Sequence, residues 1–388
     1  MNLQAIEVLV PRYGIAWYPW AVQYFFLIAL SYASLWLTVP GLIFNKSRWL
    51  PTARIAMLVC VSTTLVGPVA LLADLHQPLR FWHFYGYPAP WSWMSLGSFI
   101  LPLYLGAVIV FAWMSWRPAL KERSREHDGW FTKVAGWLSW GDWQLPRPLV
   151  VLVGLGALAL SLGIVVYTGA EIAIVRARPL WHTYWLPFAF AATGMIGACG
   201  LVMLLNRISQ AKSADVNRQM LGVLIGACVL MGLVAFTWFL DGVNAVDSSV
   251  AAALDSIKNS PQWRATALWA SASGILLFAL AILLRLRRNL WPWGWLLGLL
   301  AIHVAWMFRW VVLMNVQTVA RNSAGAHEYH VAFGSYGFLG ILGTFGLWLA
   351  AILIIDLFIP WRGNEAKAVN DRSTSSSSDV SQGAPSHG

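Results

Sequence analysis

Charged and aromatic residues are interleaved in one short stretch of this sequence, residues 73–95. The stretch contains Asp74, His76, Arg80 and His83, together with Phe81, Trp82, Phe84 and Tyr85. A carboxylate can accept a proton, an arginine can polarise an oxygen, and an apolar wall can hold a flat ring. These residue types favour a site for an amphipathic redox lipid such as a quinol. The alternative is an interfacial belt of aromatic residues and snorkelling charges that binds no ligand.

A second polar stretch follows at residues 167–182. It contains Tyr167, Glu171, Arg176, Arg178, Trp181 and His182. Both stretches come directly after long apolar runs, so the elements that position them must be membrane helices. The sequence therefore predicts that polar groups from two helix ends meet at one face of the membrane.

The composition indicates an integral membrane protein. Hydrophobic residues make up 59% of the 388-residue chain, charged residues only 11%, and the mean hydropathy is +0.63. A soluble protein carries about 25% charged residues. The apolar residues form long runs without alternation, and a bilayer crossing needs about 20 of them. We expect nine transmembrane helices, at residues 20–43, 54–73, 93–116, 149–170, 185–206, 220–240, 265–284, 293–316 and 336–359.

The basic residues predict the orientation of these helices. Most of the 26 Lys and Arg residues fall in the odd-numbered loops and the C-terminal segment. By the positive-inside rule, the N-terminus lies outside and the C-terminus inside. We thus expect an outer segment at 1–19, a transmembrane domain at 20–360 and a disordered cytoplasmic tail at 361–388. Topology also accounts for the net charge of +10, so nucleic acid is not an expected partner, whereas membrane lipid is.

Redox cofactors are not expected in this chain. Its cysteines, Cys60, Cys199 and Cys228, lie in separate apolar runs without a CxxC pair, which disfavours an iron–sulfur cluster or a structural zinc. Of the histidines, only His303 is clearly intramembrane, which disfavours a haem held by two histidines. With no metal site, haem or cluster of its own, the chain must pass any electrons from a quinol to a partner.

The stretch LLADLHQPLRFWHF, Leu71–Phe84, resembles the LLxDLGRPxRF signature of the NrfD/polysulfide reductase membrane-subunit family, and departs from it at His76 and Gln77. Three further segments look similar: WYPWAVQYFFLIAL, SWMSLGS and YTGAEIAIVRARPLWHTYWLPFAFAATG. FRWVVLMNVQTVARNSAG and GILGTFGLWLA look most like the membrane subunits of tetrathionate reductases within that family.

The resemblance implies a membrane anchor that oxidises quinol or menaquinol at the periplasmic side of a bacterial inner membrane. Its electrons would pass to an iron–sulfur subunit and on to a molybdopterin catalytic subunit. Asp74 and Arg80 carry over from the signature as the expected catalytic pair. The expected quinol-binding residues are Gln23, Tyr24, His76, Tyr167 and Arg309, with Tyr24 at a position where some family members carry histidine.

Two alternatives remain open from the sequence. The same parts could work in reverse, as the quinone-reducing anchor of a hydrogenase-like complex. A transporter is the other class, although paired broken helices with charges near mid-membrane would be typical of it. Here Asp74, Glu171 and Asp241 all stand at the outer ends of their helices, and Arg309 lies about 24 Å along an outward-running helix.

The position of these acids predicts electroneutral turnover. Quinol protons should be released outside, on the side where electrons leave, because a proton path needs titratable groups that link both faces. Proteoliposomes carrying the complex should therefore build no membrane potential during quinol oxidation. A potential that collapses with an uncoupler would contradict this prediction.

Overall fold

The computed structural model describes residues 15–125, 129–141, 143–208, 213–245, 248–287, 292–319 and 329–362. Over these residues, nine helices are long and apolar enough to cross a membrane. They confirm the all-α fold class and each of the nine expected runs. Residues 1–14 and 363–388 lie outside the described ranges, so the expected outer segment and cytoplasmic tail remain predictions.

The spanning helices are α1 (Pro19–Thr38), α2 (Leu50–Asp74), α4 (Trp93–Arg123), α6 (Arg147–Ala173), α7 (Leu186–Ile208), α8 (Ala214–Gly242), α10 (Pro261–Leu286), α11 (Gly294–Trp310) and α12 (Phe338–Phe358). A π-helical turn extends α1 (η1, Val39–Ile43) and another extends α11 (η5, Val311–Asn315). The short helices are η2 (Ser47–Trp49), η3 (Pro78–Arg80), α3 (His83–Gly86), α5 (Trp130–Ser139) and α9 (Ser249–Asn259).

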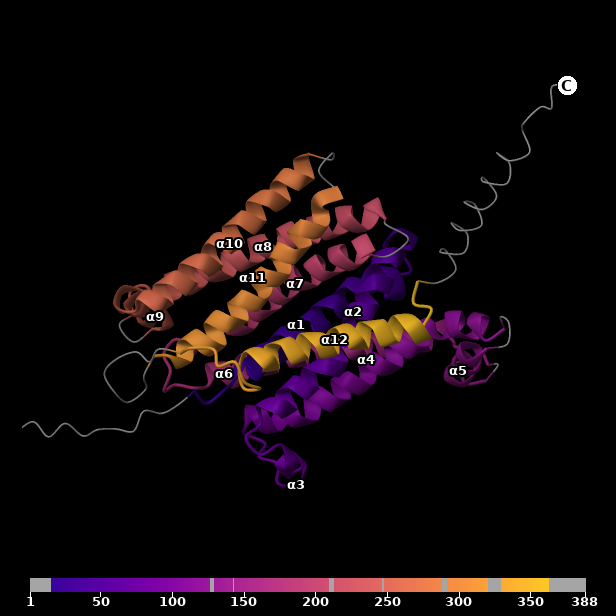
Figure 1. Ribbon diagram of the computed structural model, residues 1–388, viewed down its shortest axis with the longest axis horizontal. Helices are drawn as coiled ribbons and strands as arrows, with labels where there is room; N and C mark the ends of the chain where they lie inside the picture. The colour runs from indigo at the N-terminus through magenta and orange to yellow at the C-terminus, as the bar shows by residue number, and fades with distance from the viewer. Residues whose placement is uncertain are drawn as a thin grey trace, which may run out of the picture.

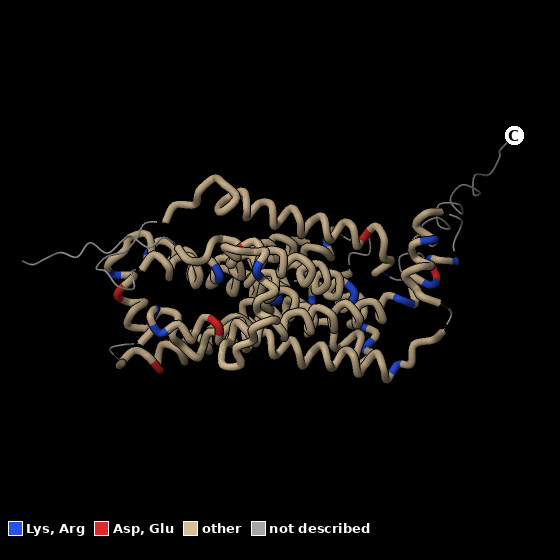
Figure 2. Tube along the Cα trace, turned by 90° about the horizontal axis from the view of Figure 1, so that it is seen from below, with Lys and Arg blue, Asp and Glu red and all other residues tan. Residues whose placement is uncertain are grey.

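The bundle has two distinct ends. The short helices α3 and α9 lie at one end and α5 lies at the other (Figure 1). Lys and Arg are more numerous at the α5 end (Figure 2). The even-numbered loops therefore share one end and the odd-numbered loops the other, as a bundle of alternating membrane crossings requires. Assigning the α5 end to the cytoplasm remains a prediction from the positive-inside rule.

Helix α1 runs through the centre of the bundle. It carries no charged residue and is buried along nearly its whole length. Helices α2, α6, α7, α11 and α12 all pack against it. Because these five helices surround it, α1 serves as the axis of the fold.

Several helices extend beyond their apolar runs at the α5 end. Helix α4 continues to Arg123, seven residues past the expected end, and its last turn carries Lys121 and Arg123. These positive charges interact favourably with the negative, C-terminal end of the helix dipole. Arg117 also donates to the Ser139 and Gly141 carbonyls, at 2.7 and 3.0 Å, and so ties α4 to α5. Hydropathy alone does not detect such extensions.

Helices α7 and α11 cross at two glycines. A Cβ atom on Gly200 would lie 2.5 Å from the Gly298 carbonyl oxygen, and one on Gly298 would lie 2.6 Å from that of Gly200. Small residues at membrane-helix crossings allow this close backbone approach. The crossing therefore depends on the absence of both side chains.

Gly200→Ala should destabilise the protein by roughly 1–3 kcal/mol, because the added methyl group meets backbone that cannot rotate away. The loss of stability is measured by thermal unfolding in detergent, with size-exclusion chromatography as the readout of folded protein. Gly232→Ala on α8 is the matched control, since nothing lies within 4 Å of its Cβ position. Equal stability of the two variants would contradict this account of the crossing.

Candidate functional site

A cavity of about 320 Å³ opens at the α3 end of the bundle. Five segments build it: the start of α1, the end of α2, the loop with α3, the start of α4 and the end of α6. We call it the Asp74 cavity. Its lining residues are Trp17, Ala21, Phe25, Pro68, Leu71, Leu72, Asp74, Leu75, Phe81, Phe84, Tyr85, Met94, Gly97, Ser98, Leu101, Pro102, Leu105, Tyr167 and Glu171.

Two carboxylates from different helices face this largely apolar cavity. Asp74 is the last residue of α2, and Glu171 lies in the last turn of α6. Tyr167 stands one helical turn before Glu171, and the two side chains are close enough to interact electrostatically. The cavity thus combines two proton acceptors and a phenol with apolar and aromatic walls.

Asp74 also has a structural contact. Its Oδ1 accepts a hydrogen bond from the backbone N–H of Tyr18 at 2.9 Å. Tyr18 is the N-cap residue of α1, so the carboxylate lies at the positive end of the α1 dipole. No ion pair joins Asp74 to Arg80 within the described residues. Arg80 is exposed on η3 and lies outside the cavity wall.

Tyr24 lies buried beside Tyr167. Its hydroxyl is close enough to interact electrostatically with Tyr167 and Glu171, yet no described residue meets it with hydrogen-bond geometry. Gly97 makes room for this arrangement, since a Cβ atom there would lie 2.0 Å from the Tyr167 ring. The Tyr167 ring therefore packs directly on the backbone of α4.

Three other expected site residues lie away from the cavity wall. Gln23 accepts from Trp306 Nε1 at 3.1 Å and donates to the Ile341 carbonyl at 3.3 Å. Arg309 is fully buried, where it donates to the Phe190 carbonyl at 2.9 Å and to the Thr193 hydroxyl. His76 is exposed, with its ring 5.2 Å from that of Tyr18. The roles assigned to these three residues remain predictions.

Comparison with known proteins identifies the family. Residues 8–320 match the polysulphide reductase, NrfD family. The chain belongs to the NrfD family. It is 32% identical to the C subunit of tetrathionate reductase from Salmonella typhimurium, over 90% of this chain and 94% of that protein. It is also 22% identical to the C subunit of selenate reductase from Mesobacillus selenatarsenatis, over 49% of this chain and 47% of that protein. The C component of polysulfide reductase from Wolinella succinogenes is 25% identical, over 53% of this chain and 62% of that protein.

The family match confirms the resemblance drawn from the signature that contains Asp74. It also confirms a multi-pass protein of the bacterial inner membrane. Within the described residues, no three His, Cys, Asp or Glu side chains form a group that could hold a metal ion. His303, the intramembrane histidine, accepts a hydrogen bond from Trp269 Nε1 at 3.1 Å.

Two residues that were not among the expected site residues help to form the Asp74 cavity. Glu171 belongs to the polar stretch at residues 167–182, but only its four-residue spacing from Tyr167 indicates that the two side chains share a helix face. Gln317 lies in the segment FRWVVLMNVQTVARNSAG, but its sequence context does not indicate a contact with the start of α1. Its Oε1 accepts from the backbone N–H groups of Ala16 and Trp17, each at 2.9 Å, and its Nε2 donates to the Trp17 carbonyl at 3.0 Å. Gln317 thereby fixes Trp17 in the cavity wall.

Asp74→Ala should lower the free energy of unfolding by about 1 kcal/mol, because the α1 N-terminus loses a capping acceptor. Asp74→Asn keeps an oxygen at Oδ1 and should stay close to wild type. Thermal unfolding of the purified chain compares the two variants. If both unfold at the same temperature, the bond to Tyr18 has no capping role.

Proposed function

We propose that this NrfD-family chain oxidises quinol in the Asp74 cavity and passes the electrons to an iron–sulfur subunit. That subunit would deliver them to a molybdopterin catalytic subunit that reduces a sulfur compound such as tetrathionate. The observation that carries this proposal is the pair of carboxylates, Asp74 and Glu171, in an otherwise apolar cavity at one end of the membrane bundle.

The cavity suits the head of a quinol or menaquinol. Its volume lies at the lower end of the roughly 300–1,000 Å³ typical of small-molecule sites. Trp17, Phe25 and Phe84 supply aromatic walls for a flat ring. Leu72, Phe81, Tyr85 and Met94 are lining residues with exposed side chains, and they give an isoprenoid tail an apolar exit toward lipid.

Oxidation of the quinol releases two protons and two electrons. Asp74 accepts the proton of one hydroxyl, because a carboxylate that bonds Tyr18 N–H through one lone pair still has others available. The second hydroxyl lies toward Tyr167, and the neighbouring Glu171 carboxylate accepts the second proton. Both electrons leave to the iron–sulfur subunit, and the quinone returns to the bilayer.

The identities of the relatives support the partners and the direction. The similar proteins are C components of tetrathionate, selenate and polysulfide reductases, which are proteins of several subunits. Reduction of such compounds requires an electron donor, so quinol oxidation is favoured over quinone reduction. The partner would dock at the α3 end, close to the cavity.

Glu171→Gln should slow quinol-dependent reduction of the iron–sulfur partner by about 100-fold or more, the usual contribution of a positioned proton acceptor. Asp74→Asn should have a comparable effect. The measurement is cluster reduction in the purified complex after rapid mixing with a menaquinol analogue. Asp241→Asn is the control, because Asp241 accepts from Trp185 Nε1 at 3.3 Å and lies outside the cavity.

Membrane levels of each variant and its assembly with the partner must be measured alongside the rates. Normal assembly with a slow rate supports the proton-accepting roles. A wild-type rate in both Glu171→Gln and Asp74→Asn would place quinol oxidation elsewhere. Transport of a solute by the chain alone in liposomes would support the transporter class instead.

A further inference from the structure

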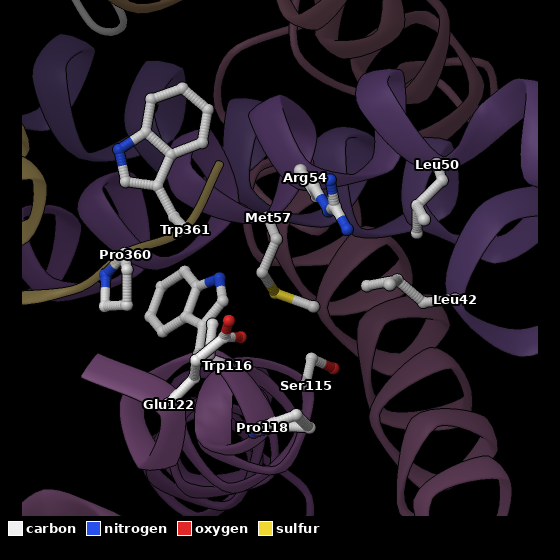
Figure 3. Close-up of a pocket in the computed structure, with 11 residues that line it drawn as sticks. Leu42, Leu50, Arg54, Met57, Ser115, Trp116, Pro118, Glu122, Pro360 and Trp361 are labelled. Carbon is white, nitrogen blue, oxygen red and sulfur yellow. The ribbon is translucent and has the colours of Figure 1, made fainter. Parts of the chain in front are cut away.

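A second cavity, of about 340 Å³, lies at the α5 end of the bundle. We call it the Arg54 cavity (Figure 3). It is formed by η1, the start of α2, the end of α4 and the segment that follows α12. Its lining residues are Leu42, Leu50, Arg54, Met57, Ser115, Trp116, Pro118, Ala119, Glu122, Pro360 and Trp361.

The two cavities lie about one bilayer thickness apart. Arg54 and Asp74 belong to the same helix, and their separation of about 20 residues corresponds to roughly 30 Å. This distance matches the hydrocarbon core of a membrane. With the Asp74 cavity at one interface, the Arg54 cavity falls at the headgroup level of the opposite leaflet.

The wall formed by the segment after α12 is held in place by polar contacts. Arg54 donates to the Arg362 carbonyl at 2.8 Å and so joins this segment to α2. Trp361 Nε1 donates to Asp356 at 2.7 Å, and Arg362 pairs with the same carboxylate at 2.8 Å. The segment is thus fastened both to α2 and to the end of α12, which maintains the cavity.

The Arg54 cavity has one charge of each sign. Arg54 enters it from α2 and Glu122 from α4, on facing sides, with the Trp116 ring beside them (Figure 3). Both charged groups also have contacts within the protein, so a ligand would share Arg54 and Glu122 with those contacts. Leu42, Met57 and Trp116 supply apolar surface. An anionic headgroup would meet Glu122 unfavourably, and a cationic one would meet Arg54 unfavourably.

We propose that the Arg54 cavity binds the headgroup of a zwitterionic phospholipid with a primary ammonium group, as in phosphatidylethanolamine. The phosphate lies toward Arg54, and the ammonium donates hydrogen bonds to Glu122. Guanidinium groups bind phosphate well, because their donors are arranged to meet two oxygens at once. Tryptophan at the membrane interface completes a setting typical of headgroup recognition. The site is independent of the proposed quinol chemistry.

The test uses the full chain purified in mild detergent and returned to nanodiscs of equimolar phosphatidylethanolamine, phosphatidylcholine and phosphatidylglycerol. After re-extraction and washing, native mass spectrometry identifies the retained lipid. Wild type should retain phosphatidylethanolamine in stoichiometric amount and in preference to the other two. Phosphatidylcholine is the informative competitor, because its methylated ammonium cannot donate hydrogen bonds to Glu122.

Two pairs of variants, each a change in the cavity with a matched control, separate loss of binding from loss of folding. Ala119→Phe fills the cavity without altering a charge and should abolish retention, whereas Ala214→Phe, an exposed site at the same end, should retain the lipid. Glu122→Gln should remove the preference over phosphatidylcholine, and Asp215→Asn, an acidic control outside the cavity, should keep it. A wild-type preference for phosphatidylglycerol, equal retention of all three lipids, or normal retention by Ala119→Phe would each overturn the proposal.

Discussion

The burial of α1 is the constraint on which the rest of the structure depends. Helix α1 carries no charged residue, and five other spanning helices cover it. Its polar side chains then require partners within the bundle. Ser31, for example, shares a hydrogen bond of 2.7 Å with the hydroxyl of Tyr104 on α4. The position of α1 also fixes its N-terminus, where Trp17 and Tyr18 meet Gln317 and Asp74.

The Asp74 cavity follows from how that N-terminus is held. Asp74 secures Tyr18 and Gln317 secures Trp17, so one wall is anchored through backbone groups and not through side-chain packing alone. Another part of the wall depends on Gly97, which allows Tyr167 to lie against α4. A polar site in a membrane bundle needs such anchoring, because unsatisfied backbone groups are costly there. Asp74 therefore contributes to the architecture of the site as well as to its proposed chemistry.

The sequence predicts those features of the structure that depend on hydropathy or on a short local motif. The nine spans follow from apolar runs, and Asp74 and Tyr167 follow from short motifs that stand at helix ends. The position of Glu171 in the cavity could be predicted only from its spacing of one helical turn from Tyr167, which places both residues on the same helix face. The positions of Gln23 and Arg309 away from the cavity depend on how helices rotate around α1. Such rotations depend on close contacts, for example between Gly200 and Gly298, that a single sequence does not display.

Helix α4 lines both cavities, with residues 94–105 at one and 115–122 at the other. It is one continuous helix of 31 residues, so the two sets of lining side chains are connected rigidly. Inserting a single residue between them would rotate one set by about 100° relative to the other and move it by about 1.5 Å. Side chains such as those of Ile109 and Val110, which are exposed at this level, can vary in type. A change in the number of residues in that segment would therefore misalign the two sets of lining side chains, whereas a change of side-chain type at its exposed positions would not.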